Sequence, residues 1–257
     1  MPFFVDAGEA FPLGVRAGST RRHGLGVSKP PFDALNLGLP RAADGDAVQD
    51  VMMNRRALRE ALGLPAEPRW LRQVHGVGVI EFYADAEPGD QEPEADAAVT
   101  RDADVVLAVL HADCLPVLLC SEDGAVLGAA HAGWRGLAAG VIEATVTAMQ
   151  VPGASLRAWL GPAAGPQHYE IDAPVREAFL DQDAAAAGAF VATRPGHWRM
   201  DLYALARRRL NALGVSAVQG GEHCSIGEPQ AFFSHRRDAR TGRTASLIWR
   251  PSAPSAG

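Results

Sequence analysis

Short apolar runs separated by turns, rather than long helices, occupy much of the chain. In several of these runs nearly every position is apolar, so strands formed from them would be buried on both faces instead of alternating between core and solvent. Several helical segments lie between or before them. This mixture predicts an α/β fold, a mixed-sheet sandwich with flanking helices, whose strand order the sequence does not give. The predicted strands are VVLAVL (105–110), LPVLLC (115–120), AVLGAA (125–130), LRAWLG (156–161), GVSAVQG (214–220) and TASLIW (244–249).

Four segments are predicted as helices. One is an Ala-rich run from Trp134 to Met149 that follows the third strand. In the segment 201–214, Asp201 can cap the first turn and Gly214 can end the helix. The other segments are AVQDVMMNRRALREALG (47–63), APVREAFLDQ (173–182) and DLYALARRRLNALG (201–214).

The overall composition is that of a folded protein without a broad charged surface. Hydrophobic residues make up 47% and charged residues 21%, far from the composition of disordered chains. We find no internal repeat or Gly/Ser linker, so we expect one domain over 1–257 with a disordered tail at 251–257. The net charge of -6 argues against binding to nucleic acid or anionic lipid. No signal peptide or apolar run of about 20 residues is apparent, so we expect a cytoplasmic protein.

Three polar segments stand out between the apolar runs. The carboxylate-rich stretch 83–104 reads as a solvated loop. The Gly/Pro loop 161–171 could line a pocket with Gln167, His168 and Tyr169. In FFSHRRDARTGR (232–243), the segment 238–243 resembles a hairpin turn, and the arginines form either a solvated basic turn or a clamp for an anion.

Three short motifs place a potential metal ligand at the edge of an apolar run. They are RQVHG (72–76), HADCLP (111–116) and AHAGWRG (130–136), which contain His75, Cys114 and His131. Two imidazoles and a thiolate suit zinc, and three protein ligands leave a fourth position for water or substrate, as in catalytic sites. Taken singly, the same residues are equally explained as a turn histidine, a small buried hydrophobe and a core histidine.

Glycines around Trp134 and Arg135 point to an anion-binding turn. Gly133 and Gly136 flank this pair where a helix is expected to begin, and the free N–H groups of a helix start favour an anion. The planar guanidinium of Arg135 suits phosphate or carboxylate. The alternative is a surface arginine beside a packed tryptophan. No nucleotide-binding glycine fingerprint is present.

Six ordered motifs in this chain closely resemble the YfiH family, also called the laccase-domain or polyphenol oxidase family and peptidoglycan editing factor. They are RQVHG, ADCLPVLL, AAHAGWRG, GPAAGPQHYEI, GGEHC and FFSHRRDARTGR, and the similarity extends upstream to RHGLGVSKPPFDALNLG (22–38) and MNRRAL (53–58).

The resemblance implies a single α/β domain with a zinc ion held by His75, Cys114 and His131. It also implies phosphorolysis of adenosine, inosine, guanosine and methylthioadenosine, with adenosine deamination as a further activity. Asp113 and Arg135 join the three ligands as expected catalytic residues. The expected partners are purine nucleosides and phosphate, and the expected state is a monomer or small homo-oligomer. The substrate- and phosphate-binding residues would be Asn36, Gln73, Arg135, Gln167, His168, Arg236 and Arg237.

One residue departs from the pattern of the family. His111 stands where we expect threonine or a similar residue, and a packing or supporting role is favoured over metal ligation.

Three competing functions remain at this stage. Cys114 with His75 or His131 could be a nucleophile in an amidase that edits peptidoglycan precursors. Copper-dependent polyphenol oxidation is disfavoured because the eight histidines include no His-X-His pair, although copper could still occupy the site. A binding module without catalysis is the third.

Overall fold

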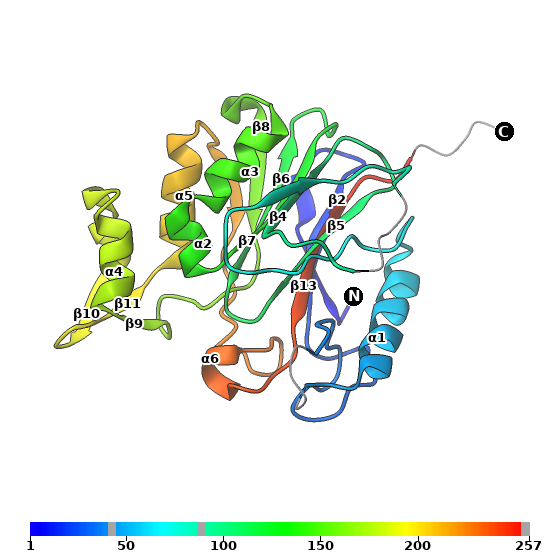
Figure 1. The fold of residues 1–257 in the computed structure, drawn as a ribbon, viewed down its shortest axis with the longest axis horizontal. Helices are drawn as coiled ribbons and strands as arrows, with labels where there is room; N and C mark the ends of the chain where they lie inside the picture. The colour runs from blue at the N-terminus through cyan, green and yellow to red at the C-terminus, as the bar shows by residue number, and fades with distance from the viewer. Residues whose placement is uncertain (41–44, 87–90, 253–257) are drawn as a thin grey trace.

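Two larger β-sheets stacked on each other form the centre of the protein (Figure 1). The computed structural model describes residues 1–40, 45–86 and 91–252. One sheet is antiparallel, with strand order β1-β2-β13-β5. Its strands are β1 (Phe4–Asp6), β2 (Arg16–Thr20), β5 (Val106–His111) and β13 (Thr244–Trp249).

The second large sheet is mixed and has the order β12-β8-β6-β7-β4-β3. Its two outer pairs, β12 with β8 and β3 with β4, are parallel, and its inner pairs are antiparallel. A smaller antiparallel sheet, β10-β11-β9, lies apart at one side. These strands are β3 (Val79–Glu81), β4 (Ala97–Thr100), β6 (Leu115–Ser121), β7 (Leu127–Ala132), β8 (Leu156–Leu160), β9 (Glu170–Asp172), β10 (Phe190–Arg194), β11 (His197–Met200) and β12 (Ala217–Gly220).

Helices cover the outer faces of the two stacked sheets. Helix α1 lies on the four-stranded sheet, whereas α2, α3 and α5 lie on the six-stranded sheet (Figure 1). The helices are α1 (Val48–Leu62), α2 (Trp134–Ala139), α3 (Val141–Met149), α4 (Ala173–Leu180), α5 (Leu202–Ala212) and α6 (His235–Asp238), with 3₁₀ turns at Gly8–Ala10, Gly153–Ser155 and Ala184–Ala189.

Burial of both sheet faces explains the uninterrupted apolar runs. In β6, Leu118 and Cys120 pack between the sheets, whereas Val117 and Leu119 face the helices. In β5, Leu107 likewise faces the space between the sheets. The predicted mixed-sheet sandwich with flanking helices is therefore confirmed; a single domain over 1–257 stays a prediction.

Three local predictions are wrong. The helix expected from Trp134 to Met149 is two helices, because Gly140 has φ +102° and its N–H caps the end of α2. The stretch 83–104 is not wholly a loop, since β4 and the buried Asp96 lie inside it. The segment 238–243 is no hairpin turn, because it begins at the last residue of α6 rather than after a strand, and β13 pairs with β2 and β5.

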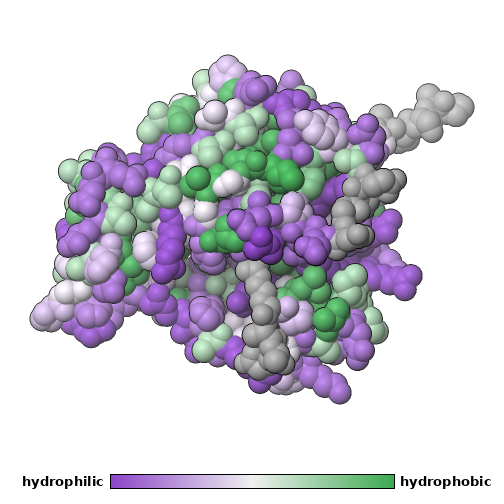
Figure 2. Space-filling view, in the orientation of Figure 1, coloured by the Kyte–Doolittle hydropathy of each residue, from purple (hydrophilic) through white to green (hydrophobic). Residues whose placement is uncertain are grey.

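Hydrophilic residues cover most of the face shown in Figure 2. Among the described residues, no helix is both long enough and apolar enough to cross a membrane. Of the tail expected at 251–257, residues 253–257 lie outside the described part of the chain.

Candidate metal centre

His131 enters the site from the end of β7, an inner strand of the six-stranded sheet. Its side chain is buried, and its Nδ1 donates a hydrogen bond to Asp96 Oδ1 at 2.9 Å. This bond leaves Nε2 as the ring nitrogen available to a ligand.

His75 belongs to a turn that the same carboxylate holds. Asp96 is fully buried and accepts the backbone N–H groups of Val74 (3.1 Å), His75 (2.9 Å) and Gly76 (2.7 Å). The turn needs this support because His75 has φ +63°, which is unfavourable for a residue with a side chain. Burial alone would raise the pKa of Asp96, but hydrogen bonds from His131 and Gly76 lower it. Asp96 therefore fixes the positions of both histidines.

Cys114 lies on the tight connection between β5 and β6. Asp113, just before it, has φ +86°, and this sharp turn carries Cys114 to the edge of the sheet. The Cys114 Sγ atom lies 3.8 Å from His75 Nε2. Burial would raise the pKa of this thiol, but His131 and His75 lower it to about 6. Burial would lower the pKa of His131, but the Cys114 thiolate and Asp96 raise it to about 9.

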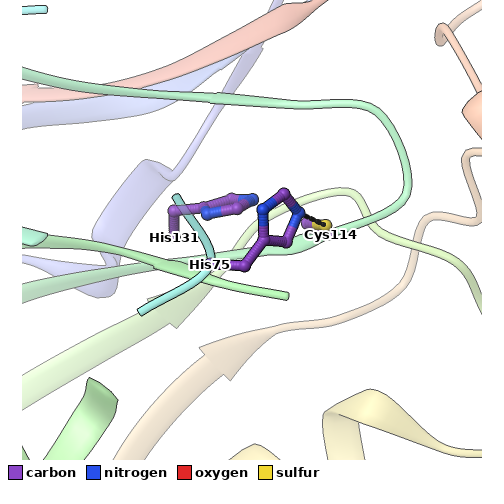
Figure 3. A group of neighbouring side chains, drawn as sticks. All are labelled: His75, Cys114 and His131. Atoms are coloured by element: carbon purple, nitrogen blue, oxygen red, sulfur yellow. Dashed lines mark hydrogen bonds between the residues drawn. The ribbon is translucent and has the colours of Figure 1, made fainter. Parts of the chain in front are cut away.

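The three side chains converge on one point (Figure 3). Their candidate ligand atoms all lie within 4.8 Å of one another, and the two imidazole rings are 4.9 Å apart and nearly perpendicular. A Cβ atom at Gly133 would lie 2.9 Å from Cys114 Sγ and 3.0 Å from His75, so only glycine leaves room there. His131 is buried while His75 is exposed, which leaves one side accessible. This donor set suits an open zinc site.

A cavity of about 1110 Å³ adjoins the three ligands. Arg135 lines it, stacks on Trp134 at 4.5 Å, and makes no hydrogen bond or ion pair within the described part of the chain. Its positive charge is therefore available to an anion. Further basic side chains on the cavity wall are Arg72, His235, Arg240 and Arg243.

Asn36 and Gln73 also line the cavity, but both amides hold the backbone. Gln73 donates to the Leu110 carbonyl and accepts its N–H, both at 2.7 Å. Asn36 accepts the N–H groups of Gly38 (3.1 Å) and Arg243 (2.8 Å). These two residues shape the wall of the cavity.

His111 also reaches the cavity but stands apart from the ligand cluster. It is buried, and its Nε2 lies 2.8 Å from Ser246 Oγ. Burial, together with the charges of His131 and Arg243, lowers its pKa to about 3, so the ring is neutral. His111 is thus a packed, uncharged histidine.

The other expected site residues do not line this cavity. Asp113 accepts hydrogen bonds from Ser225 Oγ and the Arg236 N–H, both at 2.6 Å, and so braces loops rather than facing the ligands. Arg236 donates to the Glu170 carbonyl and stacks on Tyr169. Arg237 donates to three backbone carbonyls and to Asp238. Gln167 lines a separate small cavity, and His168 contacts Cys224.

Comparisons with known proteins agree over nearly the whole chain. Residues 16–251 match a family model described as "Multi-copper polyphenol oxidoreductase laccase". A protein of Xylella fastidiosa named purine nucleoside phosphorylase is 55% identical, with 93% of each chain covered. Purine nucleoside phosphorylase YfiH of Escherichia coli is 46% identical over 93% of this chain and 95% of its own. The crystal structure of a Neisseria meningitidis protein has a TM-score of 0.90 at 43% identity, covering 97% of this chain and all of that one.

Proposed function

Because the chain belongs to the YfiH family of laccase-domain proteins, we propose that it is a purine nucleoside phosphorylase. Relatives that are 46–55% identical bear that name. The observation that carries the proposal is the His75–Cys114–His131 cluster, which opens onto a cavity that also contains the guanidinium of Arg135, a group with no hydrogen-bond or ion-pair partner among the described residues. Such a site could hold a metal ion, a nucleoside and phosphate together.

In the finer form of the proposal, the enzyme is zinc-dependent and acts on adenosine, inosine, guanosine and methylthioadenosine, with adenosine deaminase activity as well. His75, Cys114 and His131 would hold the zinc. When bound, zinc supplies a Lewis acid that stabilises negative charge and activates water. The protein's own contribution is to hold the two imidazoles and the thiolate in place.

Phosphorolysis needs an anion placed beside the ribosyl carbon, where positive charge develops as the base departs. Arg135 is the residue best placed to hold that anion, because it lines the cavity and has no charged partner in the part of the chain that the structure describes. Phosphate would accept two parallel hydrogen bonds from its guanidinium. Within the described residues, neither Arg236 nor Arg237 lines this cavity.

Product analysis tests the reaction directly. We expect purified, metal-loaded protein to convert adenosine to adenine and ribose 1-phosphate only when phosphate is present, as followed by chromatography. Inosine formed with or without phosphate would make deamination the main reaction. Unchanged adenosine in both samples would contradict the proposed nucleoside chemistry.

Replacing Arg135 with alanine should raise the KM for phosphate about tenfold or more, because a charge-assisted hydrogen-bonded pair is lost. Initial rates at varied phosphate and saturating nucleoside measure this effect. Arg236→Ala is the matched control, since that guanidinium bonds to Glu170 and lies outside the cavity wall. Equal effects of the two substitutions on the phosphate KM would argue against a phosphate site at Arg135.

A cysteine-nucleophile amidase acting on peptidoglycan precursors is the second candidate. The lowered pKa of the Cys114 thiol and its distance of 3.8 Å from His75 Nε2 favour it, because such a pair can form a reactive thiolate. This candidate predicts activity that persists after chelation and a stable acyl adduct on Cys114. Copper-dependent polyphenol oxidation has less support than either of these functions. The described residues form one group of three candidate ligands at this site, whereas that reaction would use a multinuclear cluster of histidines.

A further inference from the structure

A second cysteine–histidine pair lies outside the cavity of the metal centre. Cys224 follows β12, and His168 lies in the loop before β9; the Cys224 Sγ atom is 3.4 Å from His168 Nδ1. Neither residue lines the cavity that contains Cys114. We propose that Cys224 and His168 form a reactive-thiol site at which a hydroperoxide oxidises the sulfur.

Three hydrogen-bonding groups converge on this sulfur. Besides His168, the backbone N–H groups of Gly165 and Gly227 both point at Sγ, each with N to S at 3.3 Å. These groups can form hydrogen bonds with the sulfur, and the thiolate is the form of a cysteine that attacks electrophiles. The imidazole can also accept the proton that the thiol gives up.

Glycine is required at two positions next to Cys224 and His168, because a side chain there would collide with one of these two residues. A Cβ atom at Gly165 would lie 3.0 Å from Cys224 Sγ, and one at Gly227 would lie 2.9 Å from His168 Cε1. The Cys224 backbone is fixed as well, because its N–H donates to Glu228 at 2.7 Å and Ser225 donates to Asp113. The pair is therefore held in its geometry by the fold.

The three cysteines differ in access to a small oxidant. Cys224 is half-buried, and its neighbours His168 and Gly227 are exposed. Cys120 is fully buried between the sheets, where burial raises the pKa of its thiol to about 12. Cys114 is one of the three candidate metal ligands. Cys224 is thus the thiol that combines access with neighbouring donors.

The oxidation balances with hydrogen peroxide as the only added reagent. The Cys224 thiol passes its proton to His168, and the thiolate attacks one peroxide oxygen, forming the S–O bond as the O–O bond breaks. The sulfur loses two electrons and becomes a sulfenic acid, while peroxide is reduced. The departing hydroxide takes the proton back from His168 and leaves as water.

Site-resolved trapping of sulfenic acid tests the proposal. The metal-loaded full chain is treated with limiting hydrogen peroxide and dimedone, digested with trypsin and analysed by mass spectrometry. Cleavage after Arg209 and Arg236 leaves Cys224 alone on one peptide, whereas Cys114 and Cys120 share the peptide 102–135. We expect the Cys224 peptide to be labelled first, and faster than the same peptide labelled in unfolded protein.

Substitution of the imidazole separates its role from simple exposure. His168→Asn should slow labelling of Cys224 about tenfold or more, because both the proton acceptor and one donor to sulfur are lost. His197→Asn is the control, since that ring bonds to the Pro195 carbonyl and does not touch Cys224. Gly227→Ala, which displaces the His168 ring instead of removing it, should also slow the labelling. Labelling of Cys224 no faster than in unfolded protein, or unchanged in both His168→Asn and Gly227→Ala, would overturn the proposal.

Discussion

Cys114→Ala should reduce the bound zinc from near one ion per chain to a trace and lower turnover of adenosine by about a thousandfold or more. The thiolate is one of the three candidate ligands, and the two imidazoles alone would hold zinc far less tightly than the complete set. Removal of the sulfur also takes away the negative charge beside His131, whose pKa the thiolate raises. Elemental analysis of the purified variant and chromatography of its products measure the two effects.

Cys120→Ala serves as the control for this substitution. Its sulfur lies between the two sheets, on the strand β6 that follows Cys114, so the variant should lose stability from a small void while retaining zinc and turnover. A Cys114→Ala protein that keeps its zinc but loses activity would favour the cysteine-nucleophile function. One that keeps both would show that the thiolate is neither a required ligand nor a nucleophile.

The sequence could predict the layered fold and two of the three candidate ligands for a single reason. Strands buried on both faces stand out as apolar runs, and a histidine or cysteine at the end of such a run is placed at a sheet edge. Cys114 directly precedes β6, and His131 lies near the end of β7, the antiparallel neighbour of β6, so the two residues come together at the same end of these strands. His75 lies in a turn rather than a strand, and only its motif suggested that it joins them.

Asp96 could not be recognised from the sequence as the buried carboxylate that holds both histidines. It stands among other carboxylates in the stretch 83–104, where acidic residues are ordinarily solvated. The one available signal is that Asp96 directly precedes the apolar residues of β4, so a strand begins there and carries the carboxylate inward.

The arginines of 236–243 could not be assigned for a different reason. Their directions depend on the four-residue helix α6 and on Ala239, which has φ +55°. In this segment the side chains of Arg236 and Arg237 donate hydrogen bonds to backbone carbonyls. Those of Arg240 and Arg243 lie on the cavity wall. Such a reversal over a few residues leaves no periodic pattern in the sequence.

Asp96→Asn should weaken zinc binding by about 10- to 100-fold, the usual effect of removing a carboxylate that orients a metal-binding histidine. In the protein, Oδ1 accepts from His75 N–H and His131 Nδ1, and Oδ2 accepts from Val74 and Gly76 N–H groups. An asparagine supplies one oxygen and one NH₂ group, so two of these donors would face another donor. The His75 turn and the His131 ring would then both lose their fixed positions.

A stability loss accompanies this substitution, because each buried donor left without an acceptor costs about 1–3 kcal/mol. The measurements are therefore zinc affinity, by competition with a chelator, and the free energy of unfolding of the metal-free protein. Asp33→Asn is the control: its carboxylate pairs with Arg22 at 2.8 Å, so the variant should lose stability and keep its zinc affinity. If Asp96→Asn lost stability while binding zinc as tightly as the unaltered protein, the carboxylate would support the fold without positioning the ligands. A general weakening of the fold would lower the zinc affinity of both Asp96→Asn and Asp33→Asn. A loss of zinc affinity in Asp96→Asn alone would therefore show that the Asp96 carboxylate positions the ligands.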